Sequence, residues 1–189
     1  MVNLRFGKDY RMDLVETPGG KKERKMIYVG PLYAYVDTEE AHSKQRIFFT
    51  VSGALAMVLF LAGFSFYSNI SRVWFASIPY ACNLLVLYLY IEGAFYFWKY
   101  RDRLNREQKE KGGDRFKSTS LVASVLCFVS MVSGFVSVFF YLDAVVINDY
   151  LFLGIDLLLL MLTFFVHVKA KEITYREEPN PVAKEWADK

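Results

Sequence analysis

Four long apolar stretches constrain the fold of this chain more than any other feature of its sequence. They run approximately over residues 47–67, 78–98, 121–141 and 150–168, and polar segments separate them. Each is close to the roughly 20 residues with which an α-helix crosses a hydrocarbon layer about 30 Å thick. Because lipid offers the backbone no hydrogen-bond partners, the four stretches predict four transmembrane helices.

The composition supports this interpretation. Hydrophobic residues make up 54% of the chain and aromatic residues 17%, and almost all of the charged 23% lies outside the four stretches. We therefore predict an all-α membrane protein, with an up-down-up-down bundle of four transmembrane helices over residues 38–176. Within it, residues 99–120 are predicted to form a cytoplasmic helical hairpin, and residues 177–189 a mobile cytoplasmic tail.

The basic residues predict the orientation of the bundle. Of the 23 Lys and Arg residues, 22 lie before the first stretch, between the second and third, or after the fourth, and the exception is Arg72. Loops rich in Lys and Arg stay in the cytoplasm, so both termini are predicted to be cytoplasmic in a multi-pass protein of the plasma membrane. The first 46 residues are polar, so we expect the first stretch to act as a signal anchor without a cleavable signal peptide.

Residues 1–37 predict a small β-rich element on the cytoplasmic side. A turn signal at 17–20 lies between two stretches rich in strand-forming residues, 10–16 and 25–29, and a third stretch follows at 32–36. This pattern predicts a hairpin or a short meander. Since an isolated hairpin is marginally stable in water, we expect it to pack on the membrane surface, on the helix ends or on a partner.

Capping signals predict where the helices begin and end. Asp37 followed by Glu40 resembles a capping box and predicts that a helix starts there and continues into the first span. Pro79 is a favoured first-turn residue and predicts the start of the second helix. This helix is expected to run on to Lys111, before a pair of glycines, and the fourth helix to continue to Arg176, before two prolines.

Two polar residues inside the apolar stretches form the candidate site. An ionised side chain in the middle of a bilayer costs about 2.5 to 3.5 kcal/mol on insertion scales. Asp156 lies roughly 9 Å along the helix from Tyr150, and a helix that starts at Pro79 places Asn83 at a similar depth. We hypothesise that the Asn83 amide donates to the Asp156 carboxyl group. The pair is either a hydrogen bond that locks two helices together or a proton or cation site.

Short sequence similarities between the two halves of the chain raise the question of an internal duplication. Residues 62–64 resemble residues 133–135, and residues 83–87 resemble residues 156–160, at separations of 71 and 73 positions. A duplication would relate two parallel two-span hairpins and make Asn83 and Asp156 equivalent. Apolar sequence produces such matches easily, so chance similarity stays open as the alternative.

Other residues suggest contacts at the membrane boundary and between helices. Glu92 is predicted to form an interfacial ion pair with a basic residue such as Lys99 or Lys169, and His167 is predicted to meet lipid headgroups. Small residues let helices approach closely, either within the bundle or against another membrane protein. Those predicted to serve in helix packing are Gly53, Gly63, Ser130, Ser133, Gly134 and Ser137.

The sequence lacks the motifs of common enzymes. It contains no His-Glu-x-x-His, no Cys-x-x-Cys, no Gly-x-Ser-x-Gly and no phosphate-binding glycine-rich loop. Cys82 and Cys127 fall inside spans and are predicted to be packing residues. We therefore predict no catalytic residue, no metal and no cofactor. The basic stretch 99–117 also contains acidic residues, so we expect it to meet anionic lipid and not nucleic acid.

Three classes of function follow from these patterns. The first is a non-catalytic accessory, scaffold or regulatory subunit of a membrane complex, with the lipid bilayer and another membrane protein as partners. The second is a small transporter or channel with its polar site at Asp156 and Asn83; four spans rarely enclose a pathway, so it would act as a homo-oligomer. The third, an intramembrane enzyme, fits the sequence least.

Overall fold

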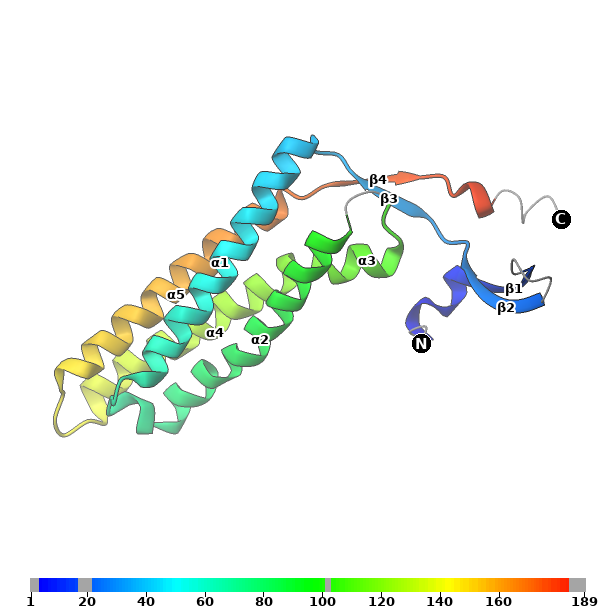
Figure 1. The fold of residues 1–189 in the computed structure, drawn as a ribbon. Helices are drawn as coiled ribbons and strands as arrows, with labels where there is room; N and C mark the ends of the chain where they lie inside the picture. Colours follow the sequence, from blue (N-terminus) through cyan, green and yellow to red (C-terminus); the bar gives the residue numbers. More distant parts are fainter. Residues whose placement is uncertain (1–3, 17–21, 101–102, 184–189) are drawn as a thin grey trace.

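A computed structural model describes residues 4–16, 22–100 and 103–183 of the chain. In this part of the chain, four helices are long and apolar enough to cross a membrane. They are α1 (Glu39–Ser65), α2 (Trp74–Lys99), α4 (Gly113–Phe140) and α5 (Ile147–Lys171). The helices run alternately in opposite directions and pack side by side (Figure 1). The predicted mostly helical fold with four such helices is confirmed.

The helices form a closed ring in which each packs on two neighbours. α1 packs on α2, α2 on α4, α4 on α5, and α5 on α1, so α2 and α5 face each other diagonally. Short connections at 66–73, which include η2 (Ile70–Arg72), and at 141–146 lie at one end, called here the loop end. Both termini lie beyond the opposite, terminal end (Figure 1). Outward-facing Leu, Val and Phe side chains of all four helices are exposed, as they are in helices that face lipid.

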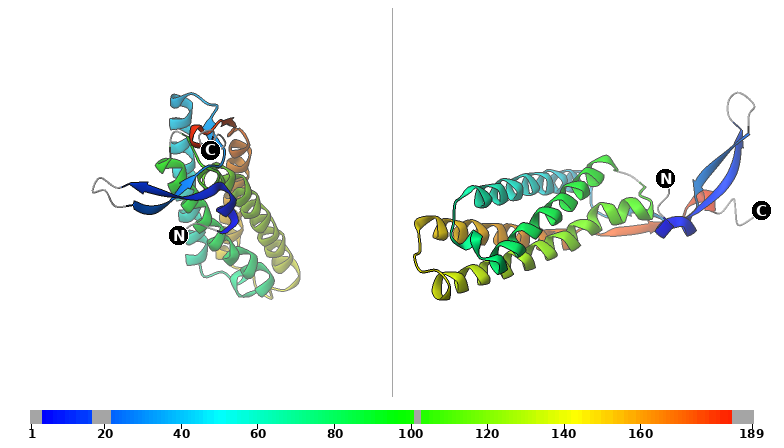
Figure 2. Two further views of the ribbon diagram at one scale, coloured as in Figure 1. Left: turned by 90° about the vertical axis from the view of Figure 1, so that its right-hand side faces the viewer. Right: turned by 90° about the horizontal axis from the view of Figure 1, so that it is seen from below.

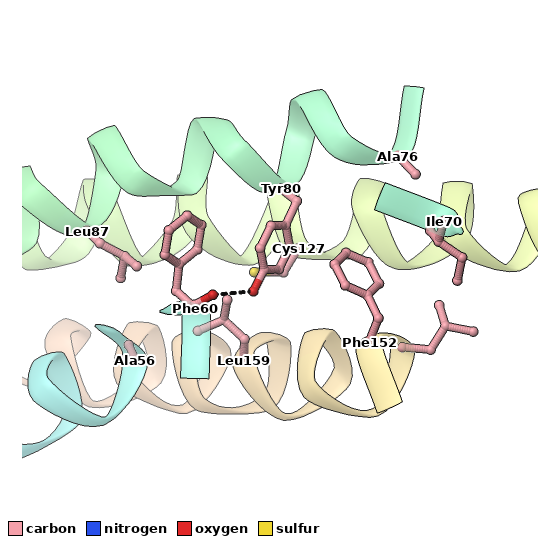
Figure 3. Close-up of a cluster of buried hydrophobic side chains, with 10 residues drawn as sticks. Ala56, Phe60, Ile70, Ala76, Tyr80, Leu87, Cys127, Phe152 and Leu159 are labelled. Carbon is pink, nitrogen blue, oxygen red and sulfur yellow. Dashed lines mark hydrogen bonds between the residues drawn. The ribbon is translucent and has the colours of Figure 1, made fainter. Parts of the chain in front are cut away.

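Aromatic rings fill the interior of the bundle. In the half near the loop end, the Tyr80 ring lies between those of Phe60 and Phe152, with 5.0 Å between ring centroids in each case (Figure 3). In the other half, Phe49 stacks on Phe116 with a centroid distance of 4.4 Å. Between helices in lipid, close packing of this kind replaces the hydrophobic effect as the main source of association.

The predicted N-terminal hairpin is present. After the short helix η1 (Leu4–Asp9), β1 (Tyr10–Glu16) pairs antiparallel with β2 (Lys22–Tyr28), and Met12 lies opposite Met26. The hairpin projects away from the terminal end of the bundle (Figure 2). The predicted turn at 17–20 lies outside the described residues.

A second sheet joins the two terminal segments and was not predicted. β3 (Leu32–Tyr35) does not extend the hairpin into a meander but pairs antiparallel with β4 (Tyr175–Glu178). The prediction that the fourth helix continues to Arg176 is therefore wrong, because the chain leaves the helix after Lys171 and becomes extended. Burial of the Tyr175 ring against Tyr35, with centroids 5.1 Å apart, stabilises the strand in place of two more helical turns.

The segment after β4 is also held in place, at least as far as residue 183. The Asn180 amide donates hydrogen bonds to the carbonyl oxygens of Tyr28 (3.1 Å) and Gly30 (2.9 Å). The prediction of a mobile tail from residue 177 is therefore wrong for residues 177–183. Residues 184–189 lie outside the described part of the chain.

Two predicted helix boundaries on α2 are wrong. The helix begins at Trp74, so Pro79 lies in its second turn and not at its start. The helix ends at Lys99, and a separate short helix, α3 (Arg106–Lys111), follows. Asn105 explains the interruption, because its side chain forms a capping box with Gln108 and starts a new helix.

Two other boundaries agree with the sequence. α1 begins one residue later than its predicted start, with Thr38 in place of Asp37 as the N-cap; the Thr38 hydroxyl accepts from the Ala41 amide at 3.3 Å. Asp37 instead accepts a hydrogen bond from the Gln45 side chain at 2.9 Å. Gly112 caps the end of α3, as the glycine pair predicted.

Candidate functional site

Asp156 is the most unusual polar residue in the bundle. It lies in the third turn of α5, its side chain is fully buried, and neither carboxyl oxygen has a hydrogen-bond partner among the described residues. The Ser130 hydroxyl of α4 is near enough to interact with the carboxyl group, although it donates to the Ala76 carbonyl at 3.4 Å. A buried acceptor without a donor costs about 1 to 3 kcal/mol, so the position is energetically unfavourable.

Asn83 points into the same part of the interior but does not bond to Asp156. Its amide nitrogen donates to the Pro79 carbonyl of its own helix at 3.4 Å, and its side-chain oxygen has no partner in the described structure. The predicted hydrogen bond from Asn83 to Asp156 is therefore wrong. α2 and α5 are diagonal in the ring, and Cys127 of α4 lies close enough to interact with both side chains. Asn83 and Asp156 thus share one polar centre without touching.

A line of polar side chains continues from this centre toward the terminal end, between α4 and α5. Cys127 interacts with Thr163, whose hydroxyl accepts from Ser124 at 3.1 Å. One helical turn further, the Ser120 hydroxyl lies 3.4 Å from Nδ1 of His167. This line consists of Cys127, Thr163, Ser124, Ser120 and His167. All five residues are buried, so the prediction that His167 meets lipid headgroups is wrong.

On the opposite side of the polar centre, a hollow opens near the loop end. It has a volume of about 270 Å³, and its lining includes Phe66, Tyr67, Ser71, Ser77, Tyr80 and Phe152. Tyr80 connects the two features, because its ring lines the hollow and also lies within electrostatic range of Asp156. The Tyr80 hydroxyl is fixed by a 2.8 Å hydrogen bond to the Phe60 carbonyl (Figure 3). Tyr80 and Phe152 both line the hollow, and Phe152 lies one helical turn before Asp156 on α5.

A second, larger cleft lies at the terminal end. Its volume is about 640 Å³, and its charged lining mixes both signs: Asp37, Glu39, His42, Arg46, Arg103 and Glu178. Arg103 lies 3.6 Å from the Glu178 carboxylate. Since both acidic and basic residues line it, the cleft favours neither an anion nor a cation.

Aromatic packing forms the inner side of this cleft. The His42 ring lies against Tyr35 and Phe97, at centroid distances of 3.9 Å and 4.6 Å. Burial raises the pKa of both Tyr35 and Tyr175 above the ordinary tyrosine value, so both phenols stay protonated at neutral pH. The cluster therefore joins β3, β4 and the helix ends through packed aromatic rings, of which the two tyrosines are uncharged.

The predicted partners of Glu92 are wrong. Glu92 forms its ion pair with Arg115 of α4. Lys169 instead pairs with Glu172 at 3.0 Å, and the Lys99 ammonium lies 5.3 Å from the centroid of the Tyr100 ring. Arg115 reaches Glu92 because α2 and α4 are neighbours in the ring, an arrangement that the sequence does not specify.

Most of the small residues predicted to serve in helix packing do so inside the bundle. A methyl group on Gly53 would lie 2.7 Å from the Tyr90 ring, and one on Gly134 would lie 2.7 Å from Leu153. Gly63 similarly packs against Tyr80 and Ile155. Ser130 and Ser137 are fully buried, while Ser133 is partly exposed. Packing within the bundle therefore accounts for five of the six.

Sequence reasoning missed Asp149, a second fully buried carboxylate. It lies at the loop end and accepts hydrogen bonds from the Ser68 hydroxyl (2.8 Å) and from the backbone amides of Asn69 (2.6 Å), Ile70 (3.3 Å) and Val146 (2.9 Å). The bond from Val146, three residues earlier, was a recognisable capping signal; the bonds from the other loop were not readable from the sequence. Asp149 therefore joins the two connections of the bundle.

Comparison with known proteins adds no family to these observations. No protein-family model, no curated protein and no solved structure matches the chain. Among the described residues, no three His, Cys, Asp or Glu side chains lie together as a metal site would need. Function has therefore to be inferred from the structure itself, from Asp156 with its polar surroundings, the cleft at the terminal end and the hairpin β1–β2.

Proposed function

We propose that this protein is a multi-pass protein of the cell membrane and serves as a non-catalytic accessory, scaffold or regulatory subunit of a membrane complex. The four apolar helices and their exposed Leu, Val and Phe side chains support insertion into lipid. The distribution of Lys and Arg supports an orientation with the terminal end in the cytoplasm and the loop end outside. The lack of familiar catalytic motifs in the sequence supports a non-catalytic role.

The hairpin β1–β2 is the observation that carries this proposal. Its base is held to the rest of the protein by hydrogen bonds such as that from the Arg106 amide to the Tyr28 hydroxyl (3.0 Å). Further along the hairpin, the facing residues Met12 and Met26 are 64% and 53% exposed. A two-stranded hairpin in water is marginally stable, and exposed methionines suit an adaptable protein contact. We infer that the hairpin docks on a partner at the cytoplasmic surface.

Co-purification tests this role. We expect the protein, extracted from its native membranes in mild detergent, to carry a different chain at fixed stoichiometry, and the double substitution Met12→Ser with Met26→Ser to lose that chain. Lys8→Ser is the matched control, because Lys8 is exposed just before the hairpin and its replacement leaves the methionine pair intact. A defined homo-oligomer with no second chain would contradict the proposal and favour the small transporter or channel.

A further inference from the structure

Asp156 and Asn83 leave three buried oxygen acceptors without donors in the described structure. These are both carboxyl oxygens of Asp156 and the side-chain oxygen of Asn83. In an apolar interior, each unsatisfied acceptor is costly, and a lone carboxylate is more costly still. These three oxygens therefore favour the binding of a species that supplies a positive charge or a hydrogen-bond donor.

A proton is the species that suits the oxygens of Asp156 and Asn83. The titratable groups that face the Asp156 carboxyl group are Tyr80 of α2 and Cys127 of α4, and no basic side chain is among the groups that interact with it in the described chain. A hard metal cation takes about six or more oxygen ligands. The two residues and the Ser130 hydroxyl offer fewer than that. A proton needs one oxygen, occupies no additional volume and turns an acceptor into a donor.

We propose that Asp156 is a proton-binding site that exchanges with water on the loop side of the membrane. A proton from water in the hollow binds one carboxyl oxygen and leaves a neutral carboxylic acid, and the reverse step returns it. Tyr80 and Phe152 line the hollow with their ring centroids 5.0 Å apart, and Phe152 lies one helical turn before Asp156, so in this proposal movement of these rings controls the exchange. The site is independent of partner docking at the hairpin, which lies at the opposite end of the molecule (Figure 1).

Infrared spectroscopy of the full-length protein in lipid vesicles tests the site. We expect a carbonyl band of a protonated carboxyl group that titrates with pH, is lost in Asp156→Asn and is retained in Asp143→Asn. Asp143 is the matched control, because it is an exposed aspartate in the connection at the loop end. The proposal is overturned if the band is missing from the folded wild type at every pH, if it survives in Asp156→Asn, or if it changes with sodium concentration at constant pH.

The rate of isotope exchange tests the route. After transfer to D₂O, we expect the Asp156 band to shift at least tenfold faster in Phe152→Leu, because the smaller side chain opens the inner wall of the hollow. Phe116→Leu replaces an equally buried ring in the other half of the bundle and should leave the rate unchanged. Thermal unfolding of each variant verifies that it is folded. An unchanged rate in Phe152→Leu, or an equal acceleration in both variants, overturns the route through the hollow.

Discussion

At the scale of single residues, the two buried aspartates have opposite energetic roles although they lie seven positions apart on one helix. Asp149 accepts four hydrogen bonds, whereas Asp156 accepts none that meets ordinary geometry in the described structure. The first carboxylate contributes to stability, and the second lowers it. A position that violates the rules of stable packing is a candidate for a functional role.

Replacing Asp156 with an apolar residue of similar size should therefore stabilise the protein. We expect Asp156→Leu to raise the free energy of unfolding by about 1 to 3 kcal/mol, since it removes buried acceptors that have no donor. Thermal unfolding in detergent, followed by circular dichroism, measures the change as a higher Tm. A lower Tm for Asp156→Leu would show that the carboxyl group has a structural partner. It would contradict the view that Asp156 lowers stability and serves a function instead.

The opposite result is expected at Asp149. Asp149→Ala leaves the Ser68 hydroxyl and the backbone amides of Asn69 and Val146 without their acceptor, whereas the Ile70 amide keeps the Ser68 hydroxyl at 3.1 Å. Hydrogen bonds to a charged group contribute about 1.5 to 3 kcal/mol each. We expect a loss of roughly 3 kcal/mol or more, measured as a lower Tm. Asp143→Ala removes an exposed aspartate from the same connection and should leave Tm nearly unchanged. Equal effects of the two substitutions would contradict the structural role of Asp149.

At the scale of helices, the distance between neighbours depends on glycines that face large side chains. The Tyr90 ring cannot easily move away from Gly53, because its hydroxyl is held by the Phe49 carbonyl at 3.0 Å and by Ser52 at 2.9 Å. By contrast, a methyl group on Gly154 of α5 would meet no atom within 4 Å. The same substitution should thus have opposite effects on the two helices.

We expect Gly53→Ala to lower Tm, because the added methyl group pushes α1 away from α2 at an overpacked contact, at a cost of about 1 to 3 kcal/mol. Gly154→Ala should raise Tm slightly, since alanine favours helix by roughly 0.5 to 1 kcal/mol over glycine. Thermal unfolding of the two variants side by side measures both effects. Destabilisation by Gly154→Ala would show that another chain or a lipid packs closely on that face.

Helices were more predictable from the sequence than the contacts among them. Apolar length alone located α1, α2, α4 and α5, because only helices satisfy the backbone in lipid. The β3–β4 pairing was not readable, since it joins residues 32–35 and 175–178 across the whole chain. The partner of Glu92 and the separation of Asn83 from Asp156 depend on the order of helices in the ring. That order is a tertiary property that no local pattern encodes.

At the scale of the whole molecule, the structure gathers both terminal segments and the hairpin beyond one end of the bundle (Figures 1 and 2). The charged cleft lies at the same end. Asn180 binds the backbone of residues 28 and 30, so the two segments share one compartment. Under the positive-inside rule we expect that compartment to be the cytoplasm. The proposed cytoplasmic partner depends on this orientation, because the orientation puts the hairpin on the inner side of the membrane and the hollow on the outer side.

Labelling of single cysteines tests the orientation. A maleimide reagent that does not cross membranes should label Asp143→Cys in intact cells, because this residue lies at the loop end. It should label Lys8→Cys only after the membrane is permeabilised. The wild type is the control for the natural Cys82 and Cys127, both of which lie within membrane-spanning helices and should stay unlabelled in intact cells. Labelling of Lys8→Cys in intact cells would place the hairpin outside, and the proposed cytoplasmic partner would then have to be abandoned.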